Sequence, residues 1–132
     1  MQLKMGYQDL LAEAQGQIET IPQEQAAGWL NDPEVLFVDI RDIRELQREG
    51  MIPGALHAPR GMLEFWVDPA SPYHKPVFAS GQRFVLYCAS AWRSALATAQ
   101  LVRMGLPRVC HLEGGFSAWK QAGRPVAFPE KH

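Results

Sequence analysis

The stretch Phe84-Val85-Leu86-Tyr87-Cys88-Ala89-Ser90-Ala91-Trp92-Arg93-Ser94 decides the fold class and contains the first candidate for a functional site. Its first four residues form a continuous apolar run, which is typical of a strand buried on both faces of a parallel sheet. The segment Ser94 to Met104 is rich in Ala and Leu, with apolar residues at helical spacing. The sequence therefore predicts a strand, a tight loop and a helix, with Cys88 at the end of the strand.

The rest of the chain continues this alternation of strands and helices. A second apolar run, Val35 to Val38, predicts another buried strand, and Arg108 to Leu112 predicts a third. Helices are expected around Tyr7 to Ala14, from Pro22, from Asp42 to Gly50, from Gly61 to Trp66 and from Ser117 to Ala122, and a short extended piece ends at His57. This alternation predicts an α/β fold with helices on both faces of the sheet.

Cys88 lies where α/β proteins bind ligands, at the carboxyl end of a strand and directly before a helix. The small residues Ala89, Ser90 and Ala91 allow the backbone to curl, so that their amides converge above the sulfur. The first amides of the helix and the positive charge of Arg93 add to the positive electrostatic potential at the sulfur. These groups favour the thiolate, which is the nucleophilic form, and they would equally stabilise an anionic persulfide.

Two features near Cys88 are open to a second interpretation. A lone cysteine after a strand is commonly a small buried hydrophobic residue without chemical function. No acidic residue lies between Asp68 and Glu113, and this stretch holds five basic residues: Lys75, Arg83, Arg93, Arg103 and Arg108. The stretch predicts either an electropositive surface that attracts a small anion or ordinary solvated cations.

Composition narrows the class of protein. A chain of 132 residues that is 47% hydrophobic can form one domain with a substantial core. The net charge of -1 and the pI of about 6.4 argue against a nucleic-acid partner. No apolar run approaches the roughly 20 residues of a membrane span, and the N-terminal residues lack an apolar signal core. We therefore expect a cytoplasmic protein that does not associate with membranes.

The cysteines and histidines do not predict a metal site or a cofactor. Cys88 and Cys110 are too few and too far apart for a disulfide framework or a zinc site. His57 and His111 lack metal-ligand spacing with each other and with either cysteine. We expect both thiols to be free, as is usual in a reducing compartment.

Several blocks of the sequence resemble those of rhodanese-homology domains. Cys88 to Arg93 resembles the active-site loop of that family, and Val38-Asp39-Ile40-Arg41-Asp42 resembles its Asp-x-Arg segment, with Glu45 where an acidic residue commonly follows. The remaining blocks are Gly50 to His57, which resembles Gly-His-Ile-Pro-Gly-Ala with Met51 in place of the usual His, Leu112 to Trp119, and Ala122 to Val126. They occur in the order of the family and cover roughly residues 18–126.

The resemblance implies a fold and a domain organisation. The fold would be a central, mostly parallel, five-stranded sheet with helices on both faces. Residues 1–132 would form a single rhodanese-like domain, with a helical N-terminal extension over 1–17 and a core over about 18–126.

The resemblance also implies a sulfurtransferase with a persulfide mechanism. A donor such as thiosulfate would pass its outer sulfur to the catalytic Cys88, and a thiol, cyanide or a sulfur-accepting protein would remove it. By their positions in the family's active-site loop, the residues implied to bind the substrate are Ala89, Ser90, Ala91, Trp92 and Arg93. Asp39, Arg41 and Ser94 are implied to support the site, the first two through a salt bridge.

Two alternative functions are considered beside this interpretation. Phosphatases and arsenate reductases related to this fold place five residues between Cys and Arg, whereas four lie between Cys88 and Arg93. A phosphate needs a wider ring of amides than one sulfur atom, so the shorter loop favours sulfur. A non-catalytic binding module is disfavoured by the presence of Cys88, whereas a carrier that serves one partner protein is still open.

Four further features have no assigned role in the site. Cys110 is interpreted as a core residue, and His57 as a buried histidine with satisfied hydrogen bonds. Trp92 stands where smaller or polar residues are common and could narrow the pocket or contact a partner. The irregular segment 68–82, which contains His74, could be a lid but is more simply interpreted as a packed surface loop.

Overall fold

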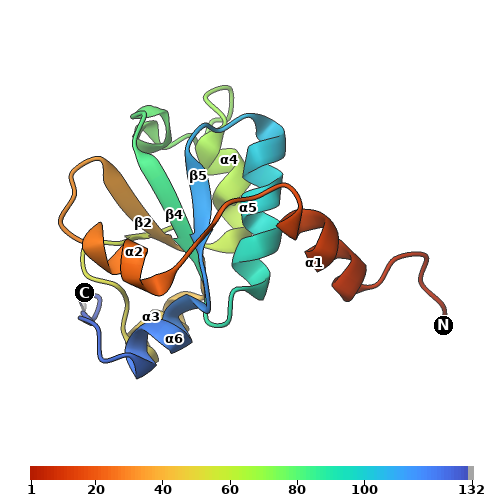
Figure 1. Cartoon of the computed structure of the whole chain (residues 1–132). Coiled ribbons are helices and arrows are strands. Elements are labelled where there is room, and N and C mark those ends of the chain that lie inside the picture. The colour runs from red at the N-terminus through yellow and green to blue at the C-terminus, as the bar shows by residue number, and fades with distance from the viewer. Residues whose placement is uncertain (131–132) are drawn as a thin grey trace.

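The computed structural model describes residues 1–130, which form a parallel sheet covered by helices (Figure 1). The strands lie in the spatial order β1-β5-β4-β2-β3, and every pair in the sheet is parallel. They are β1 (Thr20–Ile21), β2 (Val35–Asp39), β3 (Leu56–His57), β4 (Arg83–Tyr87) and β5 (Val109–Leu112). The predicted five-stranded α/β sheet is confirmed, and Cys88 follows its central strand.

Helices pack on both faces of this sheet, as predicted. They are α1 (Tyr7–Gln15), α2 (Gln23–Gly28), α3 (Ile43–Glu49), α4 (Leu63–Val67), α5 (Trp92–Met104) and α6 (Gly115–Gln121), with short 3-10 helices at η1 (Arg60–Met62) and η2 (Pro76–Ala79). Within residues 1–130, no helix has the combination of length and hydrophobicity that crossing a bilayer requires.

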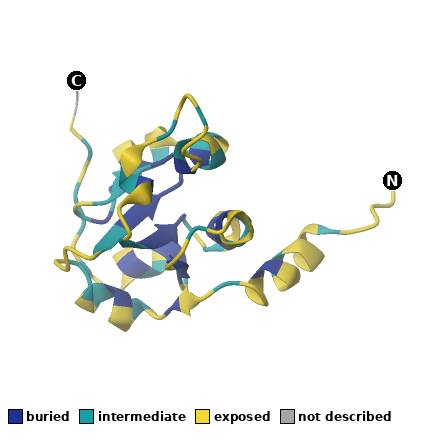
Figure 2. Ribbon diagram, turned by 90° about the horizontal axis from the view of Figure 1, so that it is seen from above, coloured by how far each residue is buried: buried dark blue, intermediate teal, exposed yellow. Residues whose placement is uncertain are grey.

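Two hydrophobic clusters fill the space between the sheet and the helices. One contains Leu86 of β4 with residues of α4 and α5, and the other contains Tyr87 of β4 with residues of α2 and α6. Figure 2 shows the buried residues concentrated in the sheet and on the inner sides of the helices. Cys88 belongs to the first cluster and Cys110 to the second, so the two cysteines lie on opposite faces of the sheet. Cys110 is a core residue, as predicted.

The N-terminal helix forms where it is expected and buries little of its surface. Tyr7 and Leu10 are exposed and only Ala14 is buried. α1 lies outside the two layers that cover the sheet, beside α5 (Figure 1), so most of its apolar surface stays exposed. The ring of Tyr7 instead packs on Trp92, with the ring centroids 5.2 Å apart.

The irregular segment 68–82 is packed rather than free. Phe78 is 3% exposed and joins the cluster under α4 and α5. The carbonyl oxygen of Trp66 accepts hydrogen bonds from the Lys75 amide at 2.9 Å and from the His74 ring at 3.0 Å. These contacts support the interpretation as a packed surface loop.

The end of β4 and the start of α6 approach each other through their backbones. The Phe116 amide donates to the Cys88 carbonyl oxygen at 2.8 Å, and the Ser117 amide donates to that of Ala89 at 3.0 Å. Gly115 makes this approach possible, because its φ is +61° and an added Cβ would lie only 2.6 Å from the Ala89 oxygen. A side chain at Gly115 would therefore push the helix away from the Cys88 loop.

We expect Gly115→Ala to destabilise the protein by more than about 3 kcal/mol, because it adds a backbone clash to an unfavourable φ. Gly81→Ala is the matched control: its φ is +80°, but an added Cβ would meet no atom within 4 Å. The control should lose only about 1–2 kcal/mol. Urea unfolding of both variants measures the difference, and equal losses would show that the close approach does not constrain the fold.

Candidate active site

Cys88 lies at the base of a tight loop between β4 and α5. It is 1% exposed, and α5 begins at Trp92, two residues before the predicted start. The residue before the helix, Ala91, has φ +80° in the left-handed region. This conformation costs a residue with a Cβ on the order of 1–2 kcal/mol. It turns the chain sharply enough to bring the start of the helix back over the sulfur.

Ser94 provides the polar contacts of the sulfur. Its amide donates to Cys88 Sγ at 3.4 Å, and its Oγ lies 3.7 Å from the same sulfur. Within residues 1–130, the amides of Ala89 to Arg93 have no acceptor on the protein. The loop therefore leaves several donors available to an anion at the sulfur.

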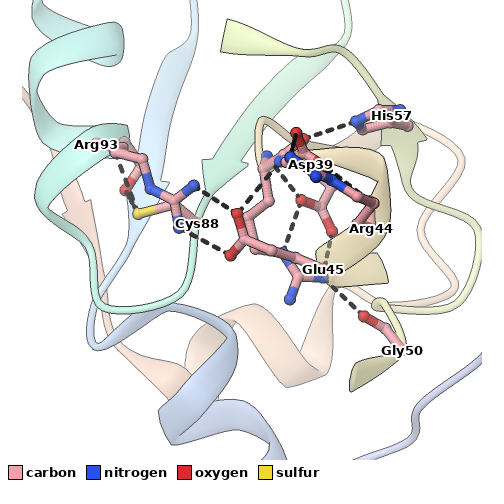
Figure 3. A network of polar contacts seen from close by, with 10 residues as sticks. Asp39, Arg44, Glu45, Gly50, His57, Cys88 and Arg93 are labelled. Carbon is pink, nitrogen blue, oxygen red and sulfur yellow. Dashed lines mark hydrogen bonds and ion pairs between the residues drawn. The ribbon is translucent and has the colours of Figure 1, made fainter. Parts of the chain in front are cut away.

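Arg93 is held at the rim of the loop by an ion pair that sequence reasoning missed. Its two terminal nitrogens donate to the two carboxylate oxygens of Glu45 in α3, at 2.8 and 3.0 Å (Figure 3). The hydrogen bond from Arg93 lowers the pKa of Glu45. The pKa of Arg93 is raised, chiefly by Glu45 and to a smaller extent by Cys88. A cation and its partner carboxylate thus stand beside the sulfur.

The Asp39–Arg41 salt bridge forms, as expected, and it is buried. The guanidinium donates to Asp39 Oδ1 at 2.9 Å and to Oδ2 at 2.7 Å, and a further bond of 2.7 Å reaches the Gly50 carbonyl oxygen. It also lies 4.4 Å from the ring centroid of Phe116 in α6. His57 is half-buried rather than buried as predicted, and its Nε2 donates to the Arg41 carbonyl oxygen at 2.7 Å. The bridge thus orders the segments around the loop without reaching the sulfur.

His111 is a second residue of the site that the sequence did not reveal. It lies in β5, is 1% exposed, and places Nδ1 3.0 Å from Ser94 Oγ. Its Nε2 lies 3.0 Å from Thr20 Oγ1 on β1. An isolated histidine in an apolar strand carried no signal of this contact, because β5 meets the start of α5 only in the folded chain.

A cavity of about 470 Å³ opens beside the loop. Its lining includes Ala89 of the loop and six charged or polar side chains of α3 and α6, namely Glu45, Arg48, Glu49, Ser117, Lys120 and Gln121. The cavity offers small polar molecules a route to the loop. A separate cavity of about 700 Å³ between α1 and α5 is lined by residues outside the Cys88 loop.

The acid-free stretch does not gather its cations at the site. Arg83 begins β4, at the opposite end of the strand from Cys88, where it pairs with Glu19 at 3.0 Å. Arg108 is bonded to the Gly81 carbonyl oxygen at 2.9 Å. Only Arg93 of the three stands at the loop, and Glu45 offsets much of its charge. The positions of these three cations favour the interpretation as ordinary dispersed charges.

The other cysteine takes no part in this site. Burial raises the pKa of Cys110 to about 11, and its Sγ lies 3.5 Å from the Phe84 carbonyl oxygen. Both cysteines are free thiols. Over the described residues 1–130, no group of three or more His, Cys, Asp or Glu side chains is arranged to hold a metal ion.

Comparison with known proteins places this site in a family. Residues 22–122 match the rhodanese-like domain. A protein from Allochromatium vinosum named sulfurtransferase is 36% identical over 114 residues, which cover 86% of this chain and 98% of the relative. Two further curated relatives are longer, and the chain spans 46% and 37% of their lengths.

Solved structures share the fold. A protein of unknown function from Rhodopseudomonas palustris, described as a possible tyrosine phosphatase, has a TM-score of 0.92 and 47% identity, with 96% of this chain and 97% of that chain covered. A thiosulfate sulfurtransferase from Pseudomonas aeruginosa has a TM-score of 0.72 and 25% identity, and the match covers 96% of this chain and 23% of the other. The chain therefore belongs to the rhodanese-like domain family, whose members include sulfurtransferases.

Proposed function

We propose that this protein transfers a sulfane sulfur from thiosulfate, or a similar small anionic donor, to a thiol or to cyanide through a persulfide on Cys88. One observation carries the proposal. The buried sulfur of Cys88 accepts a hydrogen bond from the Ser94 amide at 3.4 Å, and it lies below a loop whose amides have no protein acceptor within residues 1–130. This arrangement suits an anionic sulfur, which needs several weak donors in a site shielded from water.

The first half-reaction loads the sulfur. The Cys88 thiolate attacks the outer sulfur of thiosulfate, and a new S–S bond forms at Cys88 Sγ. The sulfur–sulfur bond of thiosulfate breaks, and its electron pair leaves with sulfite. The outer sulfur then carries the negative charge, and the amides of Ala89 to Arg93 are the donors placed to stabilise it.

The second half-reaction unloads the sulfur. Cyanide or a thiolate attacks the outer sulfur, and the electron pair of the S–S bond returns to Cys88 Sγ. Thiocyanate or an acceptor persulfide leaves, and the Cys88 thiolate is restored without an external oxidant or reductant. The Ser94 amide, which already donates to Sγ, stabilises this leaving group in the second step.

The environment of the site fits a small acceptor or a partner protein. The cavity beside Ala89 provides an approach for a small polar molecule. Trp92, 57% exposed and packed on Tyr7, offers an apolar rim that a sulfur-accepting protein could contact. Two free thiols are compatible with a reducing compartment, and we place the protein in the cytoplasm.

A phosphatase is the second candidate, because the similar R. palustris protein is described as a possible tyrosine phosphatase. Two features of this chain argue against it. Four residues separate Cys88 from Arg93, which is one fewer than in the Cys-to-Arg loops of related phosphatases. The terminal nitrogens of Arg93, which a phosphate would need, both donate to Glu45. We expect negligible hydrolysis of an aryl phosphate.

Intact mass measurement tests the persulfide directly. After incubation with thiosulfate, the protein should gain the mass of one sulfur atom, and cyanide or a thiol should remove it. Cys88→Ser should show no gain. Cys110→Ser is the matched control, because this cysteine is buried on the opposite face of the sheet, and it should load like the wild type. A wild type that gains no mass, or a Cys88→Ser variant that gains it equally, would overturn the proposal.

Replacing Arg93 with Ala should lower kcat/KM for thiosulfate at least tenfold, because it removes a cation beside the developing anionic sulfur. The stability should change by less than about 1 kcal/mol, because the Arg93–Glu45 pair is partly exposed. Arg44→Ala is the matched control, since Arg44 pairs with Asp42 on the surface and is 81% exposed. Its activity should be unchanged. A loss of stability in Arg93→Ala with normal activity per folded molecule would assign Arg93 a purely structural role.

A further inference from the structure

A chain of polar side chains, buried as far as His111, connects the sulfur to the exposed Thr20 on the edge strand β1. It runs from Cys88 Sγ to Ser94 Oγ at 3.7 Å, from Ser94 Oγ to His111 Nδ1 at 3.0 Å, and from His111 Nε2 to Thr20 Oγ1 at 3.0 Å. Ser94 and Cys88 are 0% and 1% exposed. The two half-reactions of sulfur transfer involve the first of these contacts and leave His111 without a role.

His111 is a neutral imidazole at physiological pH. Burial lowers its pKa to about 4, and it lies in a strand between apolar neighbours. A neutral imidazole has one nitrogen that donates and one that accepts. The position of its single proton therefore fixes the direction of its hydrogen bonds to Ser94 and to Thr20.

The direction of the Ser94–His111 hydrogen bond matters because the Ser94 hydroxyl has a single hydrogen to donate and three polar atoms nearby. Sγ of Cys88 lies at 3.7 Å, the Ala91 carbonyl oxygen at 3.3 Å and His111 Nδ1 at 3.0 Å. If Nδ1 accepts, the hydrogen is drawn to the imidazole and the sulfur loses this donor. If Nδ1 carries the proton, the imidazole donates to Ser94 Oγ, and the serine hydrogen is left for the Ala91 carbonyl oxygen or the sulfur, of which a thiolate is the stronger acceptor. Thr20 then donates to Nε2.

We propose that His111 is a positioning residue for sulfur transfer: its Nδ1–H holds Ser94 Oγ so that the serine hydroxyl donates to Cys88 Sγ. The proposal rests on the proposed persulfide function of Cys88. No proton is transferred along the chain, so its effect is a hydrogen bond to Sγ in both half-reactions. This bond stabilises the attacking thiolate in the first step and the leaving thiolate in the second.

Three variants separate positioning from packing. His111→Leu fills the buried position in the strand with an apolar side chain and removes the Nδ1–H donor. His111→Asn keeps an N–H near the place of Nδ1. Ser94→Ala removes the hydroxyl itself. His74→Asn is a control, because His74 is bonded to the Trp66 carbonyl oxygen and does not touch the loop.

The readout is the rate of Cys88 alkylation by iodoacetamide as a function of pH, which reports the thiolate without any sulfur donor. Loss of a hydrogen bond to the thiolate should move the midpoint of the alkylation pH profile upward by roughly one pH unit or more. His111→Leu and Ser94→Ala should both show this displacement, with slower alkylation at pH values below the midpoint. His111→Asn should stay within about twofold of the wild type, and His74→Asn should match it.

The double variant Ser94→Ala/His111→Leu should be no slower than Ser94→Ala alone, because the histidine acts only through the serine. A His111→Leu variant with an unchanged pH profile would overturn the proposal, whatever its stability. So would additive losses in the double variant.

Direct observation of the tautomer covers the case in which a His111 variant does not fold. Nitrogen-15 NMR of the wild-type imidazole should show the proton on Nδ1, and a proton on Nε2 would overturn the proposal. Failure of the persulfide function gives a different result. In that case the wild type would take up no sulfur from thiosulfate, while His111→Leu and Ser94→Ala would still slow alkylation and the proton would still lie on Nδ1.

Discussion

The buried guanidinium of Arg41 is the interaction on which the arrangement around Cys88 depends. It is bonded to Asp39 at the end of β2 and to the Gly50 carbonyl oxygen after α3, and it lies over Phe116 of α6. A buried charge costs several kcal/mol unless it is paired and hydrogen-bonded, so these partners must be kept together. The α6 backbone in turn donates to the Cys88 carbonyl oxygen at 2.8 Å. The cation thus fixes the position of the loop without touching the sulfur.

The remaining geometry of the site follows from the parallel sheet. Asp39 pairs in register with Tyr87, so β2 and β4 end side by side, and the loops that follow them meet at one edge. The Cys88 loop follows β4, and α3 with Glu45 follows β2, which brings Arg93 and Glu45 into contact. The neighbouring strand β5 supplies His111 beneath the start of α5. The site is therefore assembled from segments that are distant in sequence.

The sequence predicts the part of this site that is local in the chain. The apolar run of β4, the small residues after Cys88 and the Ala-rich helix indicated a loop around the sulfur, and the family resemblance added the reaction. Contacts between distant segments carried no such signal. Glu45 was noted only as a position where the family commonly has an acidic residue, and its pairing with Arg93 was missed. The two-residue strand β1 is too short to show a periodicity. The spacing of apolar residues in α1 predicted a helix but could not show what the helix packs against, and most of its surface is exposed.

The most direct test of sulfur loading on Cys88 is a crystal structure of the protein after treatment with thiosulfate. We predict one additional sulfur atom bonded to Cys88 Sγ at about 2.05 Å, the usual sulfur–sulfur bond length, and within reach of the amides of Ala89 to Arg93. An unmodified Cys88 with intact thiosulfate bound elsewhere, or an additional sulfur on Cys110, would contradict the persulfide mechanism.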